Sequence, residues 1–139
     1  MSSAEIVITG MGLTCALGTI AAETWRAVLA GQCGRGAMTA MESPLPPGSD
    51  GCQAAALPEE FEPGLPREAR YLRWTILAAL RDAGLGDAGA FDPLPVEPAR
   101  CAIMLGTTLH GMRAAGRFFR SGRYEELQQF LAGDTLGRR

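Results

Sequence analysis

Cys15 and His110 are the residues of this 139-residue chain with the chemistry of a nucleophile and its general base. Cys15 follows a glycine-rich turn and precedes a predicted helix, where a thiolate is favoured. His110 is the only histidine, so it is the single candidate base for such a nucleophile. Their spacing in the sequence neither establishes nor excludes a Cys15–His110 catalytic pair. The alternative is that His110 is structural or exposed and Cys15 is a small core residue.

The other chemistry-bearing residues exclude several kinds of site. The chain has no C-x-x-C pair and one histidine, which argues against a structural zinc site. All thirteen basic residues are Arg, which excludes a Schiff-base lysine and a phosphate-binding P-loop lysine. No metal and no cofactor are therefore expected. The four cysteines are widely separated: Cys15, Cys33, Cys52 and Cys101.

A dinucleotide-binding turn is also disfavoured. Gly10 and Gly12 fit the first two positions of G-x-G-x-x-G, but Cys15 occupies the third. The acidic residue expected about 20 positions further on is missing, because residues 25–41 contain neither Asp nor Glu.

Composition predicts one globular unit. Apolar residues make up 47% of the chain and charged residues 20%, which argues against extensive disorder. The net charge of −2 and the lack of a dominant basic patch argue against nucleic acid as a partner. No apolar run approaches the roughly 18 residues of a membrane span, and no signal peptide is evident. The chain is expected to be cytoplasmic, with reduced thiols and no membrane partner.

Two similar segments are predicted to be strands that position these residues. The apolar run Ile6–Ile8, in a strand predicted near 5–9, breaks at the turn Thr9–Gly12, and a second short apolar run, in a strand predicted near 101–106, also ends at glycine. Short apolar runs bounded by glycine are typical of strands buried on both faces. With a helix between them, the two runs predict parallel strands of an α/β sheet.

Two helices are expected between these strands. The first is predicted to be capped by Thr19, to run to about Ala30 and to stop at Gly31. Its predicted apolar face, with Trp25 as a core anchor, consists of Ala22, Trp25, Val28 and Leu29. The second runs from Pro66 to Gly84. Its predicted core stripe is Ala69, Leu72, Ile76, Leu80 and Ala83, and its predicted solvated face carries Arg67, Arg70, Arg73 and Arg81. Between the helices, about 32–66, prolines and glycines predict an irregular excursion, with one short strand near 53–57.

Five segments, in order, resemble the amino-terminal signature of β-ketoacyl synthases. Val7–Gly12 matches V-I-T-G-x-G, and Leu17–Gly18 supplies the later glycine. Trp25–Gly31 is similar to W-x-x-L-x-x-G, with Val28 at the leucine position. Leu77–Leu85 is similar to the family's A-L-x-D-A-G-L helix end, and Ile103–Met112 to its second strand and glycine-rich exit. The order and spacing over most of the chain carry the resemblance.

The resemblance implies an α/β thiolase-like fold, a layered αβαβα architecture, of which residues 1–139 are the amino-terminal part. Its parallel or mixed sheet would include strands near 5–9 and 101–106. It also implies an acyltransferase that forms homodimers or heterodimers in fatty acid or polyketide biosynthesis. The reaction is decarboxylative Claisen condensation of a cysteine-bound acyl group with malonyl-acyl carrier protein.

That chemistry requires a nucleophilic cysteine and two histidines that polarise the malonyl carbonyl. In the family these residues lie further along the chain than Arg139, and no cysteine here has the T-A-C context of the nucleophile. No catalytic residue is therefore assigned, and the chain alone is expected to be inert. The alternative is part of a non-catalytic partner subunit, similar to a chain-length factor.

One substrate-binding position follows from the resemblance. Leu109 matches an aliphatic residue of the glycine-rich exit that lines the acyl-chain pocket near the dimer contact. His110 stands where the family usually has glycine, so it would narrow or polarise the pocket. Leu109 and His110 are expected to affect acyl-chain length preference.

Overall fold

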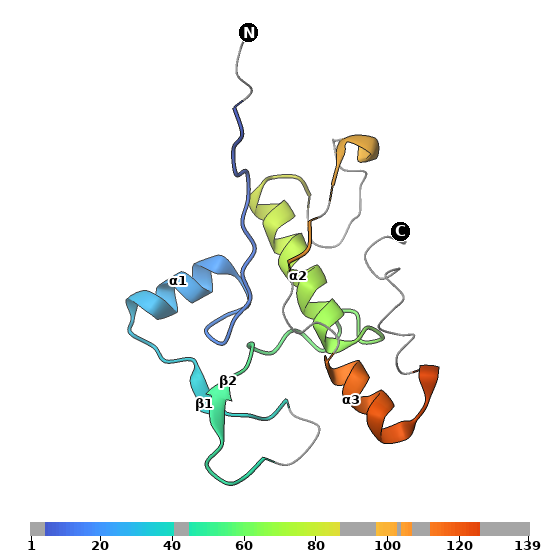
Figure 1. Ribbon diagram of the computed structural model, residues 1–139. Coiled ribbons are helices and arrows are strands. Elements are labelled where there is room, and N and C mark those ends of the chain that lie inside the picture. Colours follow the sequence, from blue (N-terminus) through green and yellow to red (C-terminus); the bar gives the residue numbers. More distant parts are fainter. Residues whose placement is uncertain (1–4, 41–44, 87–96, 103, 107–111, 126–139) are drawn as a thin grey trace.

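The computed structural model describes residues 5–40, 45–86, 97–102, 104–106 and 112–125. Within these residues the chain forms three α-helices, one short 3₁₀ helix and a two-stranded sheet (Figure 1). In chain order they are α1 (Ala21–Leu29), β1 (Arg35–Ala37), β2 (Asp50–Cys52), α2 (Arg67–Asp82), η1 (Pro98–Arg100) and α3 (Met112–Ser121).

Helix α1 lies within the range predicted from the sequence, but the predicted cap is wrong, because the N-cap residue is Ile20 and no side chain caps the helix. It ends where Gly31 adopts a left-handed conformation with φ of 66°, and the backbone N–H of Gly31 donates to the Val28 carbonyl at 3.0 Å. At its start, the Glu23 carboxylate accepts the Thr19 backbone N–H at 3.0 Å, which lowers the pKa of Glu23. The helix limits therefore follow from local residue chemistry.

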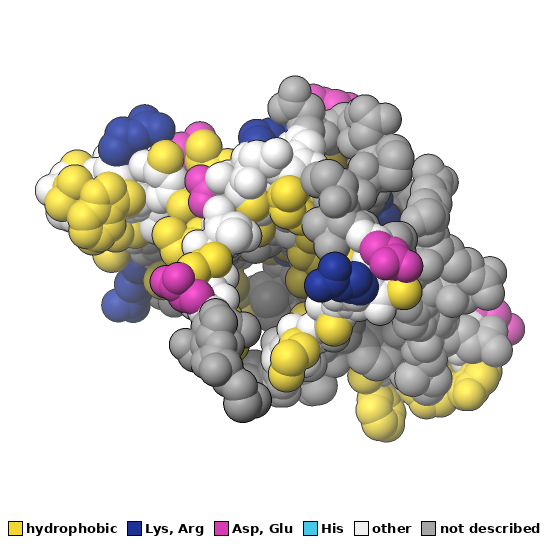
Figure 2. All heavy atoms as spheres, turned by 90° about the horizontal axis from the view of Figure 1, so that it is seen from above, with side chains coloured by type: hydrophobic (Ala, Val, Ile, Leu, Met, Phe, Trp, Pro, Cys, Tyr) yellow, Lys and Arg dark blue, Asp and Glu magenta, His cyan; other side chains and the backbone are white. Residues whose placement is uncertain are grey.

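The buried face of α1 is not the predicted one. Thr24 and Ala27 are buried, whereas Trp25 is 63% exposed, and Val28 and Leu29 are also exposed. Trp25 is therefore not a core anchor, and that prediction is wrong. The face with the small side chains packs inward because the thiol of Cys15 contacts Thr24 there. Figure 2 shows hydrophobic side chains open to solvent at the α1 side of the molecule.

The irregular excursion contains a short antiparallel hairpin. Strands β1 and β2 pair with Arg35 opposite Cys52 and Ala37 opposite Asp50. The Gln53 side-chain carbonyl then accepts the backbone N–H groups of Thr39 and Ala40, at 2.8 and 3.0 Å. The strand expected near 53–57 is thus displaced toward the amino terminus, because its pairing partner is the Arg35–Ala37 segment.

Helix α2 confirms the predicted limits and, in part, the predicted faces. Gly84 follows it with φ of 69°. Ala69 is buried and the rest of the apolar stripe is half-buried. Arg81 is exposed as expected, but Arg70 and Arg73 are half-buried and bind the preceding loop. The prediction of a solvated arginine face is therefore wrong for Arg70 and Arg73, because the loop folds back onto α2.

The two predicted strands do not form within the described residues. Segment 5–9 and the described residues of 101–106 lie in no sheet, and the only described sheet is the antiparallel β1–β2 pair. A strand requires a neighbouring strand for its backbone hydrogen bonds, and segment 5–9 has none in the described part of the chain. Figure 1 shows the segment as a single trace projecting past α1 and α2.

Candidate functional site

The glycine-rich turn lies directly against the backbone of α2. A Cβ placed on Gly10 would overlap the Ala79 carbonyl oxygen and lie 2.6 Å from the Ala83 nitrogen. A Cβ on Gly12 would overlap the Thr75 carbonyl oxygen. The two glycines are therefore explained by close backbone approach, not by nucleotide binding.

A polar network joins this turn to α2. The Met11 backbone N–H donates to the Asp82 carboxylate at 2.8 Å. The Thr14 hydroxyl lies 2.9 Å from the Thr75 hydroxyl, and the Trp74 indole N–H donates to the Thr19 carbonyl at 2.8 Å. These contacts connect residues more than fifty positions apart, so they orient the turn relative to α2.

Cys15 is held inside the turn that precedes α1. Its backbone N–H donates to the Gly18 carbonyl, and its carbonyl accepts the Ala55 N–H, both at 2.9 Å. Its Sγ lies 3.4 Å from the Thr24 hydroxyl oxygen and 3.4 Å from the Leu17 nitrogen. The hydrogen bond with Thr24, followed by the Leu17 N–H, holds the pKa of Cys15 below its ordinary value, although desolvation opposes the shift.

This arrangement favours a thiolate but supplies no general base. The polar groups at the sulfur are the Thr24 hydroxyl and backbone N–H groups, which cannot act as a base at neutral pH. The expected partner, His110, lies outside the described residues, so the Cys15–His110 hypothesis remains a prediction. The site as described can stabilise a reduced thiolate.

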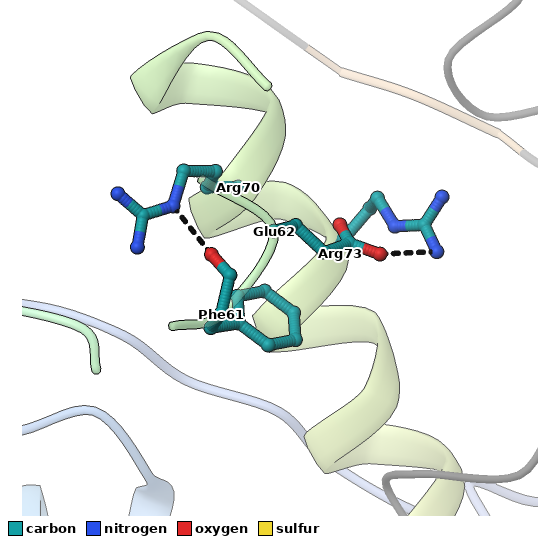
Figure 3. Close-up of polar contacts among 4 residues, drawn as sticks. All are labelled: Phe61, Glu62, Arg70 and Arg73. Atoms are coloured by element: carbon teal, nitrogen blue, oxygen red, sulfur yellow. Dashed lines mark hydrogen bonds and ion pairs between the residues drawn. The ribbon is translucent and has the colours of Figure 1, made fainter. Parts of the chain in front are cut away.

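A second polar cluster fastens the loop before α2 (Figure 3). The Arg70 guanidinium donates to the carbonyls of Phe61 and Pro58, each at 2.7 Å, and Arg73 forms an ion pair with Glu62 at 2.7 Å. Glu62 has φ of 44°, an unfavourable conformation for a residue with a side chain. Because the cluster binds backbone carbonyls of its own chain, its role is structural.

The Phe61 ring supports the same conclusion. It packs edge-on against Trp74, with the ring centroids 5.0 Å apart and an interplanar angle of 85°. Because Trp74 also donates to Thr19, the loop, α2 and the turn share one contact region. This region positions the turn that carries Cys15.

The predicted substrate-binding residues Leu109 and His110 lie outside the described residues. The remaining cysteines, Cys33, Cys52 and Cys101, are exposed, and the described cysteines form no disulfide. Among the described residues no group of three or more His, Cys, Asp or Glu side chains could hold a metal ion. No helix in that part of the chain has the length and apolar character needed to span a membrane.

Sequence reasoning missed Thr24 and Thr75 as members of the network. Thr24 and Ala27 lie three residues apart and form a narrow stripe of small side chains on α1. A stripe of this kind permits close packing, but the larger apolar residues beside it give the stronger signal for burial.

Comparisons with known proteins do not assign a family. The chain matches no protein-family model, no curated protein and no solved structure. The sequence motifs and the contacts described above are therefore the basis for a functional proposal.

Proposed function

We propose that the chain is the amino-terminal part of a β-ketoacyl synthase. The whole enzyme would be a cytoplasmic acyltransferase that extends acyl chains with malonyl units from acyl carrier protein, in fatty acid or polyketide biosynthesis. It would have the thiolase-like layered fold and act as a homodimer or a heterodimer. The ordered set of motifs from Val7–Gly12 to Ile103–Met112 is the observation that carries the proposal.

Contacts between two of these motifs support it. Gly10 and Gly12 of the first motif lie against the α2 backbone, and Gly10 does so at Ala79 and Ala83 of the Leu77–Leu85 motif. The Met11 N–H also donates to Asp82, the acidic residue of that later motif. Residues that define the resemblance therefore contact one another, as expected if both motifs preserve one packing arrangement.

The contribution of this chain would be scaffolding and acyl-chain binding. Cys15 is half-buried and has no general base among the described residues, so it is not proposed to replace the nucleophile that the resemblance places further along the chain. Residues 1–139 alone would therefore not condense acyl groups. Leu109 and His110 would line the acyl pocket in the whole enzyme.

A second candidate is part of a non-catalytic partner subunit that sets chain length. The observation that favours it is His110 at a position where the family usually has glycine. An imidazole at the pocket wall would restrict the space for an acyl chain, which is a function that requires no nucleophile.

The coding sequence beyond Arg139 tests both candidates. A T-A-C-x-x-G segment followed by two separated histidines would support the synthase, and glutamine or another residue at that cysteine would support the partner subunit. A coding sequence that ends at Arg139, or that continues with neither pattern, would overturn both candidates.

Activity of the product of that longer sequence gives the second test. Purified protein is incubated with acyl- and malonyl-acyl carrier protein, and carbon dioxide release and β-ketoacyl product are measured. We expect Cys15→Ala to retain condensation, replacement of the T-A-C cysteine by Ala to abolish it, and residues 1–139 alone to be inactive. Loss of activity in Cys15→Ala with unchanged folding would contradict the proposed roles. Unchanged chain-length selectivity after substitution of Leu109 or His110 would remove them from the pocket.

A further inference from the structure

Cys33 and Cys52 lie on the two arms of the β1–β2 hairpin. Cys52 is paired directly opposite Arg35, and Cys33 precedes Arg35 by two residues. Figure 1 shows the chain passing from α1 into β1, so Cys33 lies between the helix and the hairpin. Both thiols are free and exposed. Continuing the strand register by two residues makes the two cysteines diagonal neighbours across the hairpin.

The alternation of burial along both arms places the two thiols on one face. Cys33 and Arg35 are exposed, whereas Gly34 between them is half-buried. Gly34 faces the glycine-rich turn, because a Cβ on it would lie 2.7 Å from the Ala16 Cβ. On the other arm Cys52 is exposed and its two neighbours are half-buried. Since successive residues of a strand point to opposite faces, Cys33 and Cys52 share the face that is open to solvent.

This arrangement brings the two cysteines close to the geometry of a disulfide. Diagonal neighbours of this kind have Cα atoms about 7–8 Å apart, and a disulfide usually spans about 4.4–6.8 Å between Cα atoms. Cys33 lies just outside the paired residues of β1, so the strand pairing does not fix its backbone. A shift of about 1 Å toward Cys52 would therefore bring the pair within range.

We propose that Cys33 and Cys52 form a reversible disulfide when they meet a small disulfide oxidant such as glutathione disulfide. One cysteine thiolate attacks the oxidant, which gives a mixed disulfide and releases one glutathione thiolate. The second cysteine thiolate attacks the sulfur of the first and releases the other glutathione thiolate. The two thiolates released take up the two protons of the cysteine thiols. Two cysteine thiols and one glutathione disulfide thus become one protein disulfide and two glutathione thiols.

The bond would join the segment after α1 to the end of β2. It would thereby restrain the hairpin relative to the helix that precedes it. Arg35 on the same face would attract the anionic oxidant through its positive charge. An exposed disulfide formed at the limit of the favoured geometry is readily reduced, which is typical of regulatory disulfides. The proposal goes beyond the proposed synthase function and neither requires nor tests it.

A redox titration tests the site. The 139-residue chain is equilibrated with graded ratios of oxidised to reduced glutathione, remaining thiols are alkylated, and linked peptides are identified by mass spectrometry. We expect a Cys33–Cys52 link within one chain, with an effective concentration of the two thiols about tenfold or more above its value in urea. Excess reduced glutathione should restore both thiols. Absence of this link, or an equal effective concentration in urea, would overturn the proposal, because the fold would then not direct the pairing.

Moving one thiol along β1 tests the shared face. Each variant also carries Cys33→Ser, and circular dichroism verifies that it folds. Arg35→Cys places the thiol directly opposite Cys52 and should form the bond at least as readily as the wild-type pair. Gly36→Cys places it on the opposite face, where nothing lies within 4 Å of the added Cβ, and should lower the effective concentration about tenfold or more. Equal values for the two variants would overturn the proposed geometry.

Discussion

At the scale of single residues, the thiol of Cys15 has the most specific environment among the described cysteines. The Thr24 hydroxyl and the Leu17 N–H both lie against its sulfur, and together they hold the pKa of the Cys15 thiol below its ordinary value. A lowered thiol pKa is a common property of reactive cysteines, but reactivity in catalysis also requires a base in reach. The described structure supplies the first condition only.

Removing the Thr24 hydroxyl should raise the pKa of Cys15. In Thr24→Val the strongest interaction with the sulfur is lost, so a smaller fraction of Cys15 is thiolate at neutral pH. We expect alkylation of Cys15 to slow on the order of a few-fold, measured by peptide mass spectrometry across a pH series. Thr9→Val, at an exposed position of the amino-terminal segment, is the matched control and should leave the rate unchanged.

The same interaction makes stability depend on pH. Because the folded-state pKa of Cys15 is lowered, its contribution is complete above the unfolded-state pKa and is lost as pH falls through the folded-state pKa. The stability difference between wild type and Thr24→Val should therefore increase as pH rises through that interval. A difference that is constant with pH would contradict the assigned interaction.

At the scale of elements, the contact between the glycine-rich turn and α2 determines where Cys15 lies. Gly10 and Gly12 permit the backbone of the turn to approach the backbone of α2, and the Thr14–Thr75 contact holds the turn in place against the helix. This explains why a turn that resembles a nucleotide-binding loop has no room for a nucleotide there.

Gly12→Ala should destabilise the protein by forcing the turn away from α2. The added Cβ would overlap the Thr75 carbonyl oxygen, and overpacking of this kind costs roughly 1–3 kcal/mol in the free energy of unfolding. Gly36→Ala is the matched control, because its Cβ meets nothing within 4 Å, and it should change that free energy by about 0.5 kcal/mol or less. Urea unfolding measures both. Equal effects of the two substitutions would show that the turn does not pack on α2 in solution.

At the scale of the whole molecule, the described residues bury few large side chains. The buried hydrophobic residues are Ala27, Leu57 and Ala69, whereas Trp25 and the aliphatic residues of segment 5–9 face solvent. Exposed apolar side chains in several elements indicate surfaces that gain stability when another polypeptide covers them. In the proposed synthase, the remainder of the protein would cover part of this surface, including segment 5–9, which the resemblance places in the sheet.

The fluorescence of the two tryptophans can be used to compare the exposure of α1 with that of α2. Trp25 is 63% exposed, whereas Trp74 is half-buried between its hydrogen bond to Thr19 and the Phe61 ring. Fluorescence of Trp74→Phe, which retains Trp25, should be red-shifted and several-fold more sensitive to acrylamide than that of Trp25→Phe. Circular dichroism verifies that both variants fold. A blue-shifted, protected Trp25 in the 139-residue chain would contradict the exposed face of α1, whereas protection in the product of a longer coding sequence would support the synthase proposal.

The sequence by itself determined the helix limits and the irregular character of the excursion. Gly31 and Gly84 end their helices because glycine adopts positive φ without steric cost, which is a local property. The tertiary structure decided which face of α1 is buried, where Arg70 binds and whether segment 5–9 acquires a partner. These outcomes depend on segments distant in the chain, because burial and strand pairing require a second surface that periodicity does not identify. Cys15 illustrates both cases. The turn that carries it was evident from the glycine spacing, whereas the lowered pKa of its thiol depends on the packing of Thr24, which only the tertiary structure shows.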